Sequence, residues 1–144
     1  MMNREAVFVD TWGWMALGYQ QEPRHAEVRR IYQELGSNQI PIYTSDYVLD
    51  EVITLLFRRE SFHEATRFME GIFAASALGQ VRIERVTPGR FFAAWELRKR
   101  FQDKPRLSFT DLTSMSIMDE RGIHQVLTED RHFVQVGMGF SKIP

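Results

Sequence analysis

The segment Ala6-Val7-Phe8-Val9-Asp10 gives the clearest indication of the fold class. Four consecutive apolar residues, including two β-branched valines and one aromatic ring, indicate a strand buried on both faces of a parallel sheet. A carboxylate follows this run directly. Asp10 could simply terminate the strand, but that interpretation fits a charge placed immediately after four buried residues poorly.

Further short apolar segments recur along the chain, separated by helical patterns. Strands are expected at residues 40–44, 81–86 and 124–128, the second of these near a sheet edge because its polarity partly alternates. Helices are expected at 12–17, 23–35, 46–57, 61–73, from Pro88 through Trp95, and around 112–118. Strands that alternate with helices predict an α/β fold with a mainly parallel sheet, in which ligands bind beyond the carboxyl ends of the strands.

Polar residues and glycines mark the expected helix ends. The expected N-caps are Ser45, Ser61 in a capping box with Glu64, Thr87 followed by Pro88, and either Ser108 or Thr110. The expected stops are Gly36, as a left-handed cap, Gly79 and Gly122.

Composition narrows the class of protein. The chain has 144 residues, 44% of them hydrophobic, which fits a single domain over residues 1–144. Its net charge of -1 gives no strongly basic field, so any contact with nucleic acid requires a local patch or metal ions. The absence of cysteine excludes disulfides, thiolate zinc sites and cysteine nucleophiles. Residues 1–5 lack the pattern of an export signal, and no apolar run is long enough to span a membrane, so we expect a soluble cytoplasmic protein.

Four carboxylates stand where the predicted fold places ligand sites. Asp10 follows the first strand, Asp130 follows the fourth, Asp111 lies in the first turn of a helix, and Glu51 lies within an apolar helix. Like charges 4 Å apart repel by about 4 kcal/mol at an effective dielectric near 20, so a cluster of this kind requires cations or protons. Ligation by oxygen alone favours Mg²⁺ or Mn²⁺.

Each acid also has an ordinary structural role. Asp111 could complete a capping box with Ser108, and Asp130 could cap a turn at Arg131. Glu51 could pair with Arg58 on the same helix or lie at the edge of its apolar face. Taken singly, these roles are as probable as metal binding for Asp111 and Asp130 and are the commonest fate of a helical glutamate.

The four acids lie in segments that resemble the four acidic motifs of PIN domains, in the family's order. The segments are Val7-Phe8-Val9-Asp10-Thr11, Thr44 to Val52, Leu107-Ser108-Phe109-Thr110-Asp111, and Val126 to Phe133. The resemblance covers nearly the whole chain and is closest to VapC-type toxins of toxin–antitoxin pairs. Four ordered motifs are far more specific than any one of them.

This resemblance implies a three-layer domain whose parallel sheet is flanked by helices. It implies that Asp10, Glu51, Asp111 and Asp130 bind Mg²⁺ or Mn²⁺ and that metal-activated water hydrolyses RNA phosphodiesters. It further implies a cognate antitoxin as partner and a homodimer. Thr11, Thr110 and Thr128 lie beside or near the acids and are candidates to orient them, although capping and turn formation would equally explain them.

Two features bear on the substrate. Trp12 stands where the family often has a smaller or polar residue, which affects the expected range of substrates rather than metal binding. Lys104 and Arg106 are candidate RNA contacts, because their loop leads directly into the Asp111 motif. The four histidines, by contrast, show no metal-ligand spacing.

Other functions fit the sequence less well. The alternatives are a PIN nuclease of RNA maturation or decay that has no antitoxin, and a non-catalytic PIN-like interaction domain. A haloacid-dehalogenase-like phosphatase would need a second aspartate where Trp12 stands. A receiver domain would need an acidic pair at the end of the first strand and a matching lysine.

Overall fold

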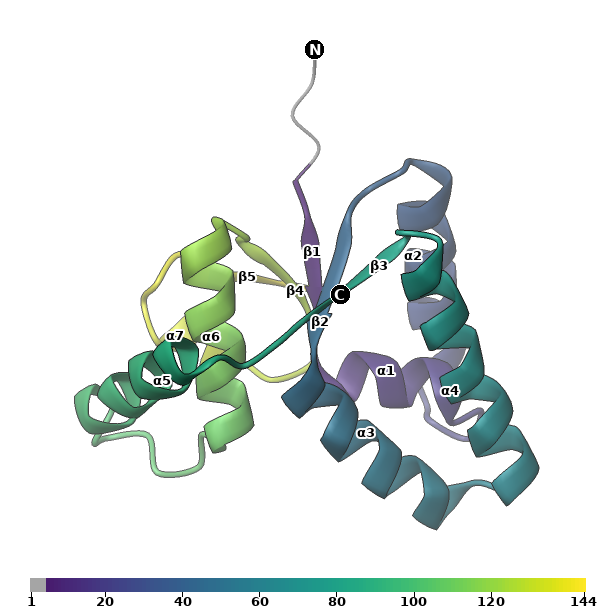
Figure 1. The fold of residues 1–144 in the computed structure, drawn as a ribbon, viewed down its shortest axis with the longest axis horizontal. Coiled ribbons are helices and arrows are strands. Elements are labelled where there is room, and N and C mark those ends of the chain that lie inside the picture. The colour runs from purple at the N-terminus through teal and green to yellow at the C-terminus, as the bar shows by residue number, and fades with distance from the viewer. Residues whose placement is uncertain (1–4) are drawn as a thin grey trace.

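A five-stranded sheet with helices on both sides forms the core of the protein (Figure 1). The computed structural model describes residues 5–144. The strands lie in the order β3-β2-β1-β4-β5, and each neighbouring pair is parallel. Their bounds are β1 Val7–Val9, β2 Ile42–Ser45, β3 Val81–Glu84, β4 Gln125–Leu127 and β5 Ser141–Ile143. The predicted α/β fold is therefore confirmed, with β3 at a sheet edge as expected.

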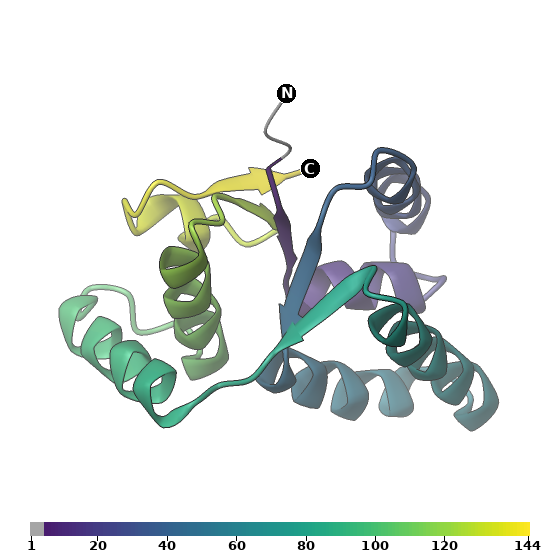
Figure 2. The same ribbon diagram turned by 45° about the horizontal axis from the view of Figure 1, so that its top comes forward.

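The helices of the described part of the chain fall into two groups. One side of the sheet carries α1 Thr11–Gly18, α2 His25–Ser37, α3 Asp46–Arg59 and α4 Phe62–Ala77. The other side carries α5 Pro88–Arg100, α6 Phe109–Arg121 and α7 His132–Gln135 (Figures 1 and 2). Within residues 5–144, no helix is both long and apolar enough to cross a membrane.

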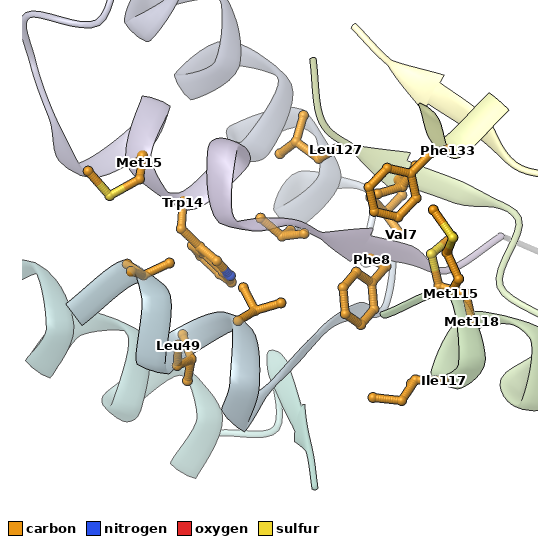
Figure 3. Close-up of a cluster of buried hydrophobic side chains, with 14 of the residues drawn as sticks. Val7, Phe8, Trp14, Met15, Leu49, Met115, Ile117, Met118, Leu127 and Phe133 are labelled. Atoms are coloured by element: carbon orange, nitrogen blue, oxygen red, sulfur yellow. The ribbon is translucent and has the colours of Figure 1, made fainter. Parts of the chain in front are cut away.

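The central strand β1 explains why its sequence is uninterruptedly apolar. All three of its residues are fully buried. Figure 3 shows Trp14 and Leu49 packed on one side of β1, and Met115 and Phe133 on the other. Both faces of β1 are therefore inside the core, and its carboxyl end places Asp10 at the start of α1.

Most of the predicted helix ends are found. The side chains of Ser45, Ser61, Thr87 and Ser108 each accept a backbone hydrogen bond as N-caps. Gly79 and Gly122 adopt positive φ angles of 76° and 66°. Gly122 directly follows α6, and Gly79 follows α4 after the C-cap residue Leu78. Ser108 rather than Thr110 caps α6, and its bonds with Asp111 form the capping box.

Several expected bounds were wrong and two elements were missed. Strand β3 ends at Glu84 rather than at residue 86, β4 covers Gln125–Leu127 rather than 124–128, and α2 spans His25–Ser37 rather than 23–35. Gly36 does not close a helix, because α2 continues to Ser37 and the left-handed residue is Gln39, with φ 55°. The side-chain amide of Asn38 donates to the carbonyl of Glu34 at 2.9 Å, which satisfies the helix end without a glycine.

Strand β2 begins and ends later than the predicted 40–44. Helix α7 and strand β5 were not predicted, because both are short and β5 is held by pairing with β4 rather than by an apolar pattern. Of the N-terminal segment considered as an export signal, residues 1–4 lie outside the described residues.

Candidate active site

The fold brings together the four predicted acids at the carboxyl ends of the central strands. Asp10 directly follows β1 and Asp130 lies between β4 and α7, while Glu51 comes from α3 and Asp111 from the first turn of α6. Their charges act on one another: Asp111 and Asp130 raise the pKa of Asp10, after the larger effect of burial. These segments are therefore neighbours in space, although up to 120 residues separate them in sequence.

Asp10 is the buried centre of this group. The residue is 4% exposed, and its Oδ2 accepts a hydrogen bond from the hydroxyl of Thr128 at 2.8 Å. Its Oδ1 is buried and has no hydrogen-bond partner among the described residues. Burial, followed by the charge of Asp111, raises the pKa of Asp10 from 3.8 to about 7. A buried carboxylate oxygen without a donor requires a cation or a proton.

Asp111 has both a structural role and a place in the acidic group. Its Oδ2 accepts the backbone N–H of Ser108, and its own N–H donates to the Ser108 hydroxyl, each at 3.0 Å. Burial raises the pKa of Asp111, and the charges of Asp130 and Glu51 add to this effect against the opposing bonds from Ser108. The capping box uses one carboxylate oxygen, so the cap does not prevent the other from binding a cation.

Thr128 links two of the acids. Its hydroxyl donates to Asp10 and accepts the backbone N–H of Asp130 at 3.0 Å. Asp130 in turn accepts, at Oδ1, the backbone N–H of His132 at 2.9 Å and lies 2.8 Å from His132 Nδ1. The expected turn-capping role of Asp130 is therefore present, with His132 as its partner. His132 was not predicted to contact the site, and its only signal in the sequence is its position two residues after Asp130.

Glu51 is held from across the sheet end rather than by its own helix. The Thr11 hydroxyl donates to Glu51 Oε2 at 2.9 Å. Among the salt bridges of the described residues none joins Glu51 to Arg58, so the alternative pairing with Arg58 is wrong. The Thr110 carbonyl accepts from the Thr113 hydroxyl, and no hydrogen bond joins the Thr110 side chain to an acid among residues 5–144. Trp12 is half-buried, with the Arg24 guanidinium 5.8 Å from the centroid of its ring.

The donor set fits a hard divalent cation. In the described part of the chain, no group of three or more Asp, Glu or His side chains is arranged so that it could hold a metal ion. The acids nevertheless offer only oxygen donors, and the buried Oδ1 of Asp10 has no hydrogen-bond partner in the described part of the chain. Mg²⁺ and Mn²⁺ prefer such oxygen ligands.

Gly13 fixes the approach of α1 to the site and was not singled out from the sequence. A Cβ at this position would lie 2.7 Å from the carbonyl oxygen of Leu127 and 2.9 Å from Val9 Cγ1. Because backbone is the nearest obstacle, any side chain here would push the start of α1 away from β4. The position of Asp10 therefore depends on this glycine.

We expect Gly13→Ala to destabilise the protein by about 1–3 kcal/mol through overpacking. Gly71→Ala is the matched control: Gly71 lies inside α4 with nothing within 4 Å of its Cβ position among the described residues, so this change should be neutral or stabilising by up to about 1 kcal/mol. Urea melts of both variants measure the difference. Equal stability of the two variants would contradict the close packing of α1 on β4.

The chain belongs to the PIN-domain family, whose model matches residues 7–138. It is 35% identical, over 131 residues, to the 23S rRNA-specific endonuclease VapC20 of Mycobacterium tuberculosis, covering 91% of this chain and 94% of that protein. The crystal structure of M. tuberculosis VapC20, a Sarcin-Ricin loop cleaving toxin, superimposes with a TM-score of 0.78 and 34% identity over 96% of this chain and 98% of that one. VapBC2 from Rickettsia felis, solved bound to a DNA fragment from its promoter, has a TM-score of 0.72 at 14% identity, covering 95% and 98% of the two chains. This last likeness shows the shared fold.

Proposed function

We propose that this chain is a metal-dependent endoribonuclease and the toxin of a type II, VapBC-like toxin–antitoxin pair. The observation that carries the proposal is the buried Oδ1 of Asp10, which has no hydrogen-bond partner within residues 5–144 and lies beside the charges of Asp111 and Asp130. The identity with a 23S rRNA-specific endonuclease supports RNA as the substrate. It also makes ribosomal RNA the first substrate to test.

Asp10, Glu51, Asp111 and Asp130 are the residues that would hold Mg²⁺ or Mn²⁺. When bound, such an ion lowers the pKa of the attacking water and offsets charge on the phosphate. The protein's own contribution is orientation. Thr128 holds one oxygen of Asp10 while its hydroxyl also accepts the Asp130 N–H, and Thr11 holds one oxygen of Glu51. These bonds restrict the side chains and leave a second oxygen of each for the cation.

Protein partners are also part of the proposal. A cognate antitoxin is supported by the VapBC complexes that share this fold. A homodimer is supported by aromatic side chains on α5 that remain exposed, namely Phe91, Phe92 and Trp95. We place the protein in the cytoplasm, with RNA, and not in a membrane. Lys104 and Arg106 are proposed to contact the RNA backbone near the acids.

RNA cleavage should disappear in EDTA and return when Mg²⁺ or Mn²⁺ is added in excess. Four acidic side chains without a cation repel a polyanion. The acidic site of the metal-free protein therefore cannot bind the scissile phosphate. The measurement is gel-resolved cleavage of ribosomal RNA by purified protein, with the Asp111→Asn variant purified in parallel to reveal contaminating nuclease. If the wild type cleaves RNA equally well with and without metal, while the Asp111→Asn preparation does not cleave it, this mechanism is ruled out.

Two alternatives make different predictions. A PIN nuclease of RNA maturation or decay would cleave RNA but would have no antitoxin gene beside its own. A non-catalytic PIN-like interaction domain would leave RNA intact under all metal conditions. The gathering of four acids disfavours the second alternative, because their mutual repulsion has no use in a purely structural domain.

A further inference from the structure

A hollow of about 410 Å³ lies beside the acidic site, between the loop of residues 101–107 and helix α7. We call it the loop hollow. Its lining is Asp103, Lys104, Pro105, Arg106, His132 and Gln135. Two cationic side chains, the carboxylate of Asp103 and the polar side chains of His132 and Gln135 therefore face a space large enough for a small polar group.

The loop hollow shares a wall with the acidic site. His132 lines the hollow and, through its backbone N–H and its Nδ1, contacts Asp130 Oδ1. Arg106 also lines the hollow and precedes the Asp111 capping box by only a short stretch of chain. A ligand in the hollow would therefore lie next to whatever reacts at the acids.

The two cations of the hollow differ in their availability. Lys104 Nζ forms a salt bridge with Asp103 at 2.8 Å, and its side chain is only 19% exposed. Arg106 is exposed and forms neither a salt bridge nor a side-chain hydrogen bond with any residue in the described range 5–144. A guanidinium with no partner presents two parallel donors, the geometry that matches a phosphate.

Hydrogen bonds from Arg98 hold the loop that carries these cations. Its guanidinium donates to the carbonyls of Leu107 at 2.8 Å, Phe101 at 2.7 Å and Lys104 at 2.8 Å. Three bonds from one side chain fix the loop before any ligand arrives. Ordering this hollow therefore costs little when a ligand binds.

We propose that the loop hollow binds one phosphodiester group of the RNA strand, adjacent to the phosphodiester that is cleaved. Arg106 is its main contact, and Lys104 contributes less because Asp103 already neutralises it. The inference rests on the proposed ribonuclease function. It adds a subsite that fixes the register of the strand relative to the acids, since contacts to flanking phosphates position a nucleic acid without reading its sequence.

The test measures binding of a short RNA that contains the cleavage site mapped with the wild-type enzyme. All variants carry Asp111→Asn, so that binding is measured without cleavage, in excess Mg²⁺. Arg106→Ala should weaken RNA binding on the order of tenfold. It should also reduce the slope of the logarithm of the binding constant against the logarithm of the salt concentration by the amount expected for about one phosphate contact. The control Arg29→Ala removes the same charge from α2, on the other side of the sheet (Figure 1), and should have a much smaller effect.

Two further changes separate a phosphate site from a general charge effect. Asp103→Asn frees Lys104 and should strengthen RNA binding, whereas Asp119→Asn, an equal change at the far end of α6, should not do so to the same extent. An RNA with a single neutral methylphosphonate should bind more weakly to the reference protein at one position flanking the cleaved bond. The Arg106→Ala protein should be insensitive to that same replacement.

The outcomes are distinguishable. RNA left intact by the wild type in Mg²⁺ and Mn²⁺ would contradict the proposed function itself. Cleavage by the wild type, combined with equal binding by the Arg106→Ala and Arg29→Ala proteins, would overturn the loop hollow alone. If Arg106→Ala fails to fold, Arg106→Lys replaces it and should lose part of the affinity. Weakened binding of a co-expressed protein partner with unchanged RNA binding would assign the hollow to that partner and overturn the proposal.

Discussion

Asp10→Asn is expected to abolish RNA cleavage, by on the order of 10³-fold or more, while stabilising the metal-free protein near pH 8. Asn retains an oxygen that accepts from the Thr128 hydroxyl. It removes the charge at the buried Oδ1, which has no partner among the described residues. Loss of activity and gain of stability in one variant would separate a functional acid from a structural one.

The pH dependence gives the sign of the stability effect. Burial raises the pKa of Asp10 to about 7 in the folded protein, against 3.8 for the ordinary group. The folded state therefore binds this proton more tightly than the unfolded state. The stability that the bound proton of Asp10 contributes is fully present below pH 3.8 and is lost as the pH rises to about 7. Its upper limit is ~4 kcal/mol.

Thermal melts in EDTA across pH 4–8 measure this effect. The stability difference between Asp10→Asn and the wild type should grow with pH up to about 7 and then level off. Excess Mg²⁺ at pH 8 should reverse the order, because an ion that binds only the native wild type stabilises it by mass action. If the stability difference between the two proteins is the same at every pH, the pKa of Asp10 is not raised in the folded protein.

Asp111→Asn is expected to abolish cleavage on the same scale while leaving the fold intact. The amide oxygen can still accept the backbone N–H of Ser108, so the start of α6 should lose at most about 1 kcal/mol. Removing the charge also relieves repulsion with Asp130 and Glu51, which raise the pKa of Asp111 after the larger effect of burial. Metal-free stability should therefore change little or increase.

Ser108→Ala is the matched control for the cap. It deletes the hydroxyl that accepts the Asp111 N–H at 3.0 Å and keeps the carboxylate. This variant should lose about 0.5–2 kcal/mol of stability and retain most of its activity. Cleavage assays and urea melts on both variants distinguish a role of Asp111 in cleavage from a role in helix capping. Normal cleavage by Asp111→Asn would leave Asp111 as a helix cap only.

The strength of a local signal explains which elements could be predicted. The buried run before Asp10 and the N-cap at Ser45 each depend on a few adjacent residues, and both were confirmed. Helix α7 and strand β5 have no such signal. Strand β5 has three residues, the first of them exposed, and is formed through hydrogen bonds to β4. Gly36 shows the opposite error, because a glycine near a helix end stops it only where the backbone must turn left-handed.

The fold class could be predicted from the sequence, and so could the identities of the four acids and their order along the chain. Apolar periodicity, caps and spaced motifs are properties of neighbouring residues, so they can be recognised without coordinates. The way in which the acids are held depends on tertiary contacts that the sequence pattern does not reveal. The bond from Thr128 to Asp10 spans 118 positions, and that from Thr11 to Glu51 spans 40. Burial of Asp10, its raised pKa and the loop hollow arise from segments that meet only after folding, because dielectric environment and distance depend on packing rather than on sequence order.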